Sequence, residues 1–245
     1  MVSLLDVQGL KTQFGAGERA VRAVDGVDMA VQPGQAMGLV GESGCGKSMF
    51  ARSLVRLLPS TGRIVAGQVF FKGEDMLAKS EAEMCALRGS EIALVLQDPL
   101  TSLNPTMRLG VQIGETLVTH GAAGSQRAAR SRVLELMGAV HLPSPEDHYG
   151  QYPHEMSGGM RQRAVIAAAL ACRPSLLICD EPTTALDVIV QAGILELLQE
   201  IKERHDTAVL LISHDMAVVN QLCERVAVMY AGRLIETGPT REVLT

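Results

Sequence analysis

Residues 41–48 of this chain are Gly41-Glu42-Ser43-Gly44-Cys45-Gly46-Lys47-Ser48, and they lie between two different kinds of sequence. The apolar run at 36–40 has the length of a buried strand, and residues 49–54 follow the pattern of an amphipathic helix. A glycine-rich loop between a strand and a helix wraps phosphate groups with its backbone N–H groups. The stretch therefore predicts a nucleotide-binding α/β protein; a glycine-rich turn that matches by accident is the simpler alternative.

The positions of this loop have separate expected tasks. We expect the loop amides to bind phosphate, Lys47 to reach the β- and γ-phosphates, and Ser48 to bind Mg²⁺. The helix that begins here adds the positive end of its dipole, which favours an anion. The predicted nucleotide-binding residues are Phe14, Gly41, Glu42, Ser43, Gly44, Cys45, Gly46, Lys47 and Ser48.

Two of these residues allow two interpretations each. Phe14 ends a predicted strand beside Gly15, where it either stacks on the nucleotide base or packs within the strand, and we favour stacking. Cys45 is either a reactive thiolate, activated by the loop amides and Lys47, or a small residue that packs inward.

The composition limits the class of protein. The chain has 245 residues, of which 47% are hydrophobic, enough for one α/β domain with a substantial core. The formal net charge is -5, and the aromatic fraction is 3% without tryptophan, so no nucleic-acid-binding surface is indicated. We expect no nucleic-acid partner.

Cysteine usage and hydropathy bear on the compartment. The five cysteines form no Cys-x-x-Cys pair, which is typical of a reducing compartment. Residues 1–6 meet a charge too early for a signal peptide, and the longest apolar run, 164–172, is about half of the ~20 residues that span a membrane. We expect a soluble cytosolic protein that reaches a membrane only through partners.

Further apolar runs outline the core. The continuous runs at 92–96, 176–179 and 208–212 predict strands that are covered on both faces. These strands alternate with helical patterns, which is typical of a mainly parallel sheet. We therefore expect an α/β fold with a P-loop NTPase core.

Two other parts are expected around this core. Shorter strand patterns, bounded by glycines, predict an antiparallel β subdomain at about 1–35 and 62–75. Between 98 and about 172 several prolines punctuate helical stretches, which predicts a helical insertion. The remainder of 1–245 is expected to form the nucleotide-binding core.

Three of the buried strands end in side chains suited to phosphate chemistry. At 180–181 we expect Asp180 to act on Mg²⁺ and Glu181 to polarise the attacking water as general base. His214 is expected to contact the γ-phosphate, and the Gln97 amide to bind Mg²⁺ or orient water. Glu181, His214 and Gln97 are thus the predicted catalytic residues, and Ser48, Gln97 and Asp180 the predicted metal ligands.

A second helix start resembles an anion site. Ser157-Gly158-Gly159-Met160 precedes the apolar run at 164–171, and Ser157 is suited to cap the helix there. A chain with one nucleotide needs only one phosphate site. We therefore expect these four residues to act on nucleotide held by a second subunit, the alternative being a capped helix without a ligand.

Together these stretches resemble the ATP-binding subunits of ABC transporters. Residues 41–48 are similar to the Walker A motif, 176–181 to Walker B, 157–163 to the signature motif and 213–215 to the switch-histidine segment, with Gln97 as the Q-loop residue. The resemblance covers nearly the whole chain. It implies ATP and Mg²⁺ as ligands, and it places Asp187 in the D-loop Ala185-Leu186-Asp187.

Residues 96–105 and 154–163 are similar to the branch that imports oligopeptides, dipeptides and nickel. This resemblance implies a second, different ATPase subunit, two membrane permeases and an extracytoplasmic substrate-binding protein, with the chain at the cytoplasmic face of the inner membrane. Many members continue past a point like Thr245 into a tail with clustered cysteines, so no tail function is carried over.

The expected function is ATP hydrolysis that drives the import of peptides or nickel. A soluble ABC ATPase of DNA repair or translation would need a long coiled-coil or basic insertion. A regulatory subunit with a degenerate site would lack Glu181 or His214. The transported solute is left open, because ATPase subunits of this class hold no specificity pocket.

Overall fold

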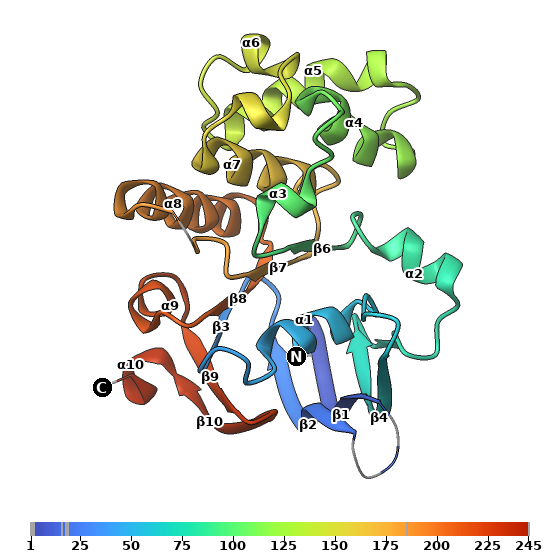
Figure 1. Cartoon of the computed structure of the whole chain (residues 1–245), viewed down its shortest axis with the longest axis vertical. Helices are drawn as coiled ribbons and strands as arrows, with labels where there is room; N and C mark the ends of the chain where they lie inside the picture. Colours follow the sequence, from blue (N-terminus) through green and yellow to red (C-terminus); the bar gives the residue numbers. More distant parts are fainter. Residues whose placement is uncertain (1–2, 16, 18–19, 185, 245) are drawn as a thin grey trace.

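The computed structural model describes residues 3–244 except 16, 18, 19 and 185. Within these residues the chain forms two sheets in one half of the molecule and a group of helices in the other (Figure 1). The helix α8 (Val188–His205) lies between the helix group and the sheets.

The larger sheet holds the strand that leads into the phosphate loop. In the described part of the chain its six strands lie in the order β10-β9-β3-β8-β7-β6, and all neighbours are parallel except β10 and β9. The expected mainly parallel sheet is therefore confirmed. Its strands are β3 (Ala36–Val40), β6 (Ile92–Val95), β7 (Leu176–Asp180), β8 (Ala208–Ser213), β9 (Arg225–Tyr230) and β10 (Arg233–Pro239).

The central strands are apolar on both faces because both faces are covered. Every residue of β3, β7 and β8 is buried. In β7, Leu177 and Cys179 face the core shared with the helices, whereas Leu176 and Ile178 face the core shared with the second sheet. Alternation of side chains along one strand thus joins two hydrophobic cores, which is why the sequence of each strand is a continuous apolar run.

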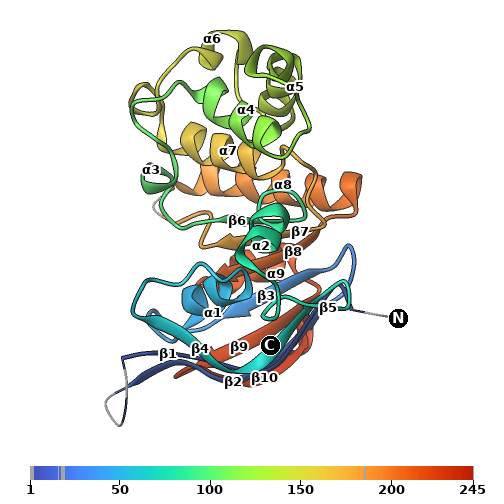
Figure 2. The same ribbon diagram turned by 90° about the vertical axis from the view of Figure 1, so that its right-hand side faces the viewer.

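The second sheet is antiparallel, as expected. Among the described residues its strands lie in the order β2-β1-β4-β5. They are β1 (Leu5–Phe14), β2 (Val21–Val31), β4 (Gly62–Phe71) and β5 (Glu74–Asp75). Seen from the side, α1 (Lys47–Leu54) lies between the two sheets, where it contacts β1, β2 and β7 (Figure 2). The buried Phe50 and Leu54 of α1 fill this space.

The helix group lies between β6 and β7 in the sequence, where a helical insertion was expected. Ser125 caps its longest helix, since its hydroxyl accepts a hydrogen bond of 3.2 Å from the Ala128 amide. The elements are α3 (Pro99–Ser102), α4 (Leu109–Thr119), α5 (Gln126–Ala139), α6 (Pro145–Tyr149), the 3₁₀ helix η2 (Pro153–Glu155) and α7 (Gly158–Ala169).

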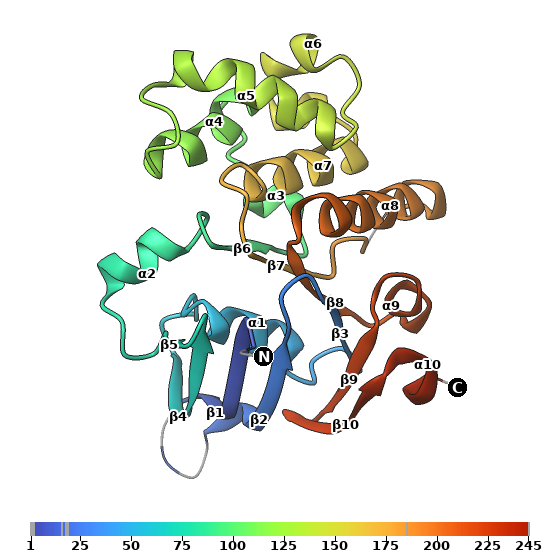
Figure 3. The ribbon, with the colours of Figure 1, turned by 180° about the vertical axis from the view of Figure 1, so that it is seen from behind.

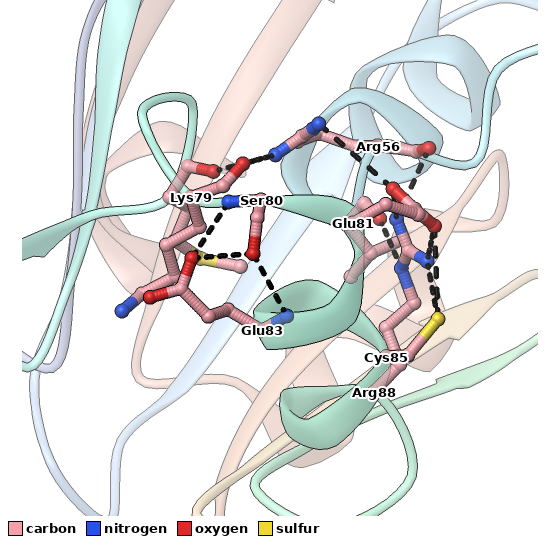
Figure 4. A network of polar contacts seen from close by, with 9 residues as sticks. Arg56, Lys79, Ser80, Glu81, Glu83, Cys85 and Arg88 are labelled. Atoms are coloured by element: carbon pink, nitrogen blue, oxygen red, sulfur yellow. Dashed lines mark hydrogen bonds and ion pairs between the residues drawn. The ribbon is translucent and has the colours of Figure 1, made fainter.

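A short helix that the sequence patterns did not predict, α2 (Glu81–Leu87), is held largely by polar contacts (Figure 4). Ser80 and Glu83 form a capping box, in which the Ser80 amide donates to Glu83 at 2.7 Å and the Glu83 amide to the Ser80 hydroxyl at 3.3 Å. Arg88 donates to the Val55 carbonyl at 2.7 Å and also binds Glu81. The network ties α2 to the C-terminal end of α1.

The last helices cover the outer side of the larger sheet, as the view from behind shows (Figure 3). They are α9 (Met216–Leu222) and α10 (Thr240–Val243). Gly38 of β3 permits close packing of α9, because a Cβ at this position would lie 2.3 Å from Val219 Cγ1. In the part of the chain that the structure describes, no helix has the length and hydropathy needed to cross a membrane.

Candidate nucleotide-binding site

The phosphate loop connects the end of β3 to the first residue of α1. Gly46 has φ 114°, and a Cβ there would lie 2.1 Å from the carbonyl oxygen of Ala23. Only glycine fits this conformation and this approach. The loop is also tied to the turn after β9, because the Gly232 amide donates to the Cys45 carbonyl at 2.8 Å.

Lys47 is buried, with 4% of its surface exposed, and its ammonium group is bound within the loop. Nζ donates to the carbonyl oxygens of Gly41 at 2.7 Å and Glu42 at 2.9 Å. These carbonyls are neutral acceptors, so a phosphate oxygen competes with them favourably for the charged donor.

Ser48 and Asp180 meet although they come from different elements. Ser48 lies in the first turn of α1 and Asp180 ends β7, and the Ser48 hydroxyl donates to Asp180 Oδ1 at 3.0 Å. Burial raises the pKa of Asp180, and the hydrogen bond from Ser48 opposes this effect. The carboxylate is thus placed where a cation would relieve the cost of burying its charge.

The donor set at this position fits magnesium. A hydroxyl and a carboxylate oxygen are ligands that Mg²⁺ prefers, and Mg²⁺ commonly takes its other ligands from phosphates and water. No group of three histidine, cysteine, aspartate or glutamate side chains suited to a metal occurs among the described residues. A bound metal would therefore depend on Ser48, Asp180 and the nucleotide itself.

Three polar groups surround one oxygen of Glu181. Its Oε2 accepts hydrogen bonds from Gln97 Nε2 at 3.0 Å and from the Thr184 hydroxyl at 2.8 Å, and it lies 3.2 Å from His214 Nδ1. The three predicted catalytic residues, Gln97, Glu181 and His214, are therefore brought together. Gln97 meets Glu181 here, and its predicted contact with a metal stays a prediction.

Thr184 is a member of this cluster that the sequence did not point to. It lies in the turn after β7, and its side chain is half-buried. Glu181 itself has φ 48°, and its amide donates to the Ile212 carbonyl of β8 at 2.9 Å. A positive φ at a glutamate is uncommon and turns its side chain away from the direction that the strand would give it.

The phosphate loop and two members of the cluster, Gln97 and Glu181, line a cavity of about 480 Å³. It brings together the loop, Gln97 and Glu181, and it is also lined by residues from β2 and from the turn between β9 and β10. The sequence patterns missed this second group, for which the Ala231-Gly232 turn was the available signal. The lining residues are Val21, Arg22, Ala23, Ser43, Gly44, Cys45, Gly46, Lys47, Ser48, Met49, Gln97, Glu181, Ala231 and Gly232.

The structure places the side chains of Phe14 and Cys45, the two residues with two interpretations each. Phe14 is half-buried, and its ring lies against Gly62, since a Cβ at Gly62 would lie 2.8 Å from its Cε1. Base stacking by Phe14 stays a prediction. Cys45 is 9% exposed and belongs to the core cluster between the sheets, with its sulfur 3.9 Å from Lys47 Nζ. This position corresponds to the inward-packing interpretation.

Ser157 caps α7 as expected, because its hydroxyl accepts from the Met160 amide at 3.3 Å. Its side chain is exposed, and α7 lies in the helix group, apart from the phosphate loop in the other half of the molecule (Figure 1). Asp187 caps α8 by accepting from the Val190 amide at 3.0 Å. Of the D-loop, residue 185 lies outside the described residues.

Known proteins resemble this chain over nearly its whole length. The sequence profile of the ABC transporter family matches residues 24–184. A probable peptide ABC transporter ATP-binding protein of Sinorhizobium fredii is 52% identical over 98% of this chain and 72% of its own length. The dipeptide transport ATP-binding protein DppD of Bacillus subtilis is 47% identical over 99% of this chain and 72% of its own length.

The fold has a solved counterpart. The ATP-binding cassette MJ0796, in a dimeric post-hydrolysis state bound to ADP and phosphate, superimposes with a TM-score of 0.86 at 25% identity, over 97% of this chain and 99% of that one. The chain therefore belongs to the ABC transporter family, of which it is an ATP-binding, ATP-hydrolysing subunit.

Proposed function

We propose that this chain binds Mg-ATP in the cavity described above and hydrolyses it to power peptide import. The observation that carries the proposal is the cluster of Gln97, Thr184 and His214 around Glu181, beside the loop of Lys47. The relatives that are 47–52% identical are named for peptide or dipeptide transport, which favours peptides over nickel.

In this proposal Lys47 exchanges the carbonyls of Gly41 and Glu42 for phosphate oxygens, and the loop amides bind the remaining phosphate oxygens. Ser48 and Asp180 would hold Mg²⁺, which would supply positive charge beside the phosphates. Glu181 accepts a proton from the attacking water. Gln97 and His214 leave Glu181 and contact the water, the metal or the γ-phosphate.

The test of this site compares Glu181→Gln with the parent. We expect ATP affinity to be kept and turnover to fall by roughly 10²- to 10⁴-fold, because general-base assistance is lost. Glu236→Gln, on the exposed strand β10, is the matched control and should keep the parent rate. Hydrolysis by Glu181→Gln at the parent rate would refute the assigned role.

We further propose that two ATPase subunits pair, and that the start of α7 acts on the partner's nucleotide. Two observations support that arrangement: Ser157 is exposed, and α7 lies apart from the phosphate loop of the same chain. The solved cassette MJ0796 is a dimer, which supports a dimeric arrangement as well. Whether the second subunit is a different chain is decided by copurification from the native host.

A groove beside α3 is the proposed contact with a membrane permease. It has a volume of about 460 Å³, and its lining includes Leu57, Leu96 and Val165 together with Arg88. Leu57 lines this groove and is 45% exposed, and Leu100 is 56% exposed in α3, whose residues Thr101 and Ser102 also line the groove. The proposed occupant of the groove is a cytoplasmic helix of a permease. The chain would then work at the cytoplasmic face of the inner membrane. An extracytoplasmic binding protein would deliver the peptide to the permease.

Because residues 98–108 connect Gln97 to the helix group, they are expected to transmit nucleotide binding to that permease. We propose that three parts of the chain move relative to one another: the antiparallel β subdomain, the helical subdomain and the nucleotide-binding core. Hydrogen exchange of the reconstituted complex should show protection of 98–108 on addition of Mg-ATP, and a crosslinker placed at Leu100 should capture a permease. Unchanged exchange there, without a crosslink, would count against the coupling.

A further inference from the structure

One member of the cluster at Glu181, Thr184, has no task in the mechanism proposed above. Thr184 donates the shortest of the hydrogen bonds to Glu181 Oε2, at 2.8 Å, compared with 3.0 Å for Gln97. It also belongs to the same turn, since the Thr184 amide donates to the Glu181 carbonyl at 3.2 Å. Two hydrogen bonds therefore join Thr184 to Glu181 within a turn of four residues.

The backbone of Glu181 is fixed, but its side chain has several rotatable bonds. The hydrogen bond from its amide to Ile212 and the turn to Thr184 hold the main chain. Among the residues that the structure describes, the polar groups that orient the carboxylate are those of Gln97, Thr184 and His214. Gln97 is exposed and the His214 side chain is 53% exposed, whereas the Thr184 side chain is half-buried.

We infer that Thr184 is a positioning residue for Glu181 during hydrolysis, an inference that rests on the proposed role of Glu181 as general base. Gln97 and His214 are assigned to the nucleotide, and they must leave Oε2 to reach it. Thr184 is the donor that stays. By holding Oε2 it directs the other oxygen, Oε1, toward the water whose proton Glu181 accepts.

The physical gain is a smaller set of side-chain conformations. A general base works only when its oxygen is within hydrogen-bond reach of the proton, and an unrestrained glutamate spends most of its time elsewhere. A hydroxyl donor in the adjacent turn restrains the carboxylate and leaves one oxygen free. Loss of one hydrogen bond to a charged group corresponds to roughly a 10- to 100-fold effect.

The decisive variants are Thr184→Val and Thr184→Ser in the full chain. Valine keeps the branched shape of threonine and removes the hydroxyl, whereas serine keeps the hydroxyl. We expect kcat to fall about 10- to 100-fold in Thr184→Val, with KM for ATP and the melting temperature unchanged, and to return to within about 3-fold of the parent in Thr184→Ser. Thr237→Val is the matched control, because it removes a hydroxyl that donates to the Val226 carbonyl at 3.3 Å in β10.

A double-mutant cycle separates positioning from a structural role. Single-turnover hydrolysis is measured for Glu181→Gln, Thr184→Val and the double variant. Positioning requires that Thr184→Val cause no further loss once Glu181 is replaced. If Glu181→Gln hydrolyses at the parent rate, the proposed general base is refuted. If Glu181→Gln is inactive but Thr184→Val keeps the parent kcat, or lowers the rate equally in both backgrounds, the inference about Thr184 is overturned.

Discussion

The Ser48 hydroxyl donates a hydrogen bond of 3.0 Å to Asp180 Oδ1, joining two residues that are 132 positions apart in the sequence. The contact places the start of α1 against the end of β7, at the edge of the sheet where the nucleotide cavity opens. Asp180 is 3% exposed, and burial raises its pKa.

Asp180→Asn should separate the function of this carboxylate from stability. When the pKa of a carboxyl is raised in the folded state, the folded protein becomes less stable as pH rises, because burial disfavours the charged form of that carboxyl. At pH 7.5 the neutral amide should therefore raise the melting temperature without nucleotide, by about 2–4 °C for each 1 kcal/mol gained. Stabilisation by Mg-ATP should be lost. Asp6→Asn is the control, and a lower melting temperature of Asp180→Asn would contradict the argument.

Lys47→Ala should weaken ATP binding itself. The ammonium group donates to two loop carbonyls and is released to bind phosphate, so its removal deletes a charge-assisted hydrogen bond. A loss of ~1.5–3 kcal/mol corresponds to affinity lower by about 10- to 150-fold. Titration calorimetry measures it, with Lys72→Ala as an exposed control that pairs with Glu91. Undiminished affinity would mean that phosphate is held elsewhere.

Ser157→Arg should impair hydrolysis at the partner's nucleotide in the reconstituted transporter. The large side chain would occupy the exposed start of α7. Ser125→Arg is a matched control, because Ser125 caps α5 with the same type of hydrogen bond, 3.2 Å from the Ala128 amide. The control should reproduce any effect of losing a cap on stability and leave turnover intact. Full turnover of Ser157→Arg would exclude a shared site.

Asp25→Asn should destabilise the chain in a pH-dependent way. Hydrogen bonds from Arg233, at 2.6 and 3.0 Å, lower the pKa of Asp25, and Lys11 adds to this effect. A depressed carboxyl pKa contributes stability above the unfolded value of about 3.9, and this contribution disappears as pH falls through the folded pKa. Urea unfolding should show the variant less stable than the parent at pH 7 and closer to it at pH 3. An equal difference at both pH values would contradict the linkage.

Alkylation should reach the exposed Cys85 first. Burial raises the pKa of Cys223 to about 12 and raises that of Cys179 as well, so both thiols should react slowly. Cys45 is buried in the core between the sheets and should also lag behind Cys85. Peptide mass mapping with time gives the order. Faster labelling of Cys45, slowed by Mg-ATP, would instead establish it as a reactive thiolate.

Much of the architecture follows from local sequence. The runs at residues 36–40, 176–179 and 208–212 hold no charged side chain because both faces of their strands are covered, so the sequence alone predicts each strand. The helix α2 was missed because it has seven residues and one buried side chain, Met84, too few for a helical period to be recognised.

Contacts between distant segments could not be predicted in the same way. The side of the cavity formed by Val21 to Ala23 and by Ala231 to Gly232 exists because β2 and the turn after β9 pack against the phosphate loop. The residue types at these positions do not by themselves indicate nucleotide binding. Their backbone position creates the site. Contacts between residues about 200 positions apart decide that position, such as the hydrogen bond of 2.8 Å from the Asp25 amide to the Gly232 carbonyl.

The sequence by itself determined the chemistry of this protein: the phosphate loop with Lys47 and Ser48, and the polar ends of the strands at Gln97, Asp180 and His214, because phosphate and metal ligands require particular residue types at particular spacings. Tertiary structure alone decided how these groups are oriented. The positive φ of Glu181 and the turn that follows it direct the Glu181 carboxylate toward the Thr184 hydroxyl. No residue pattern encodes that direction, since it depends on the pairing of β7 with β8.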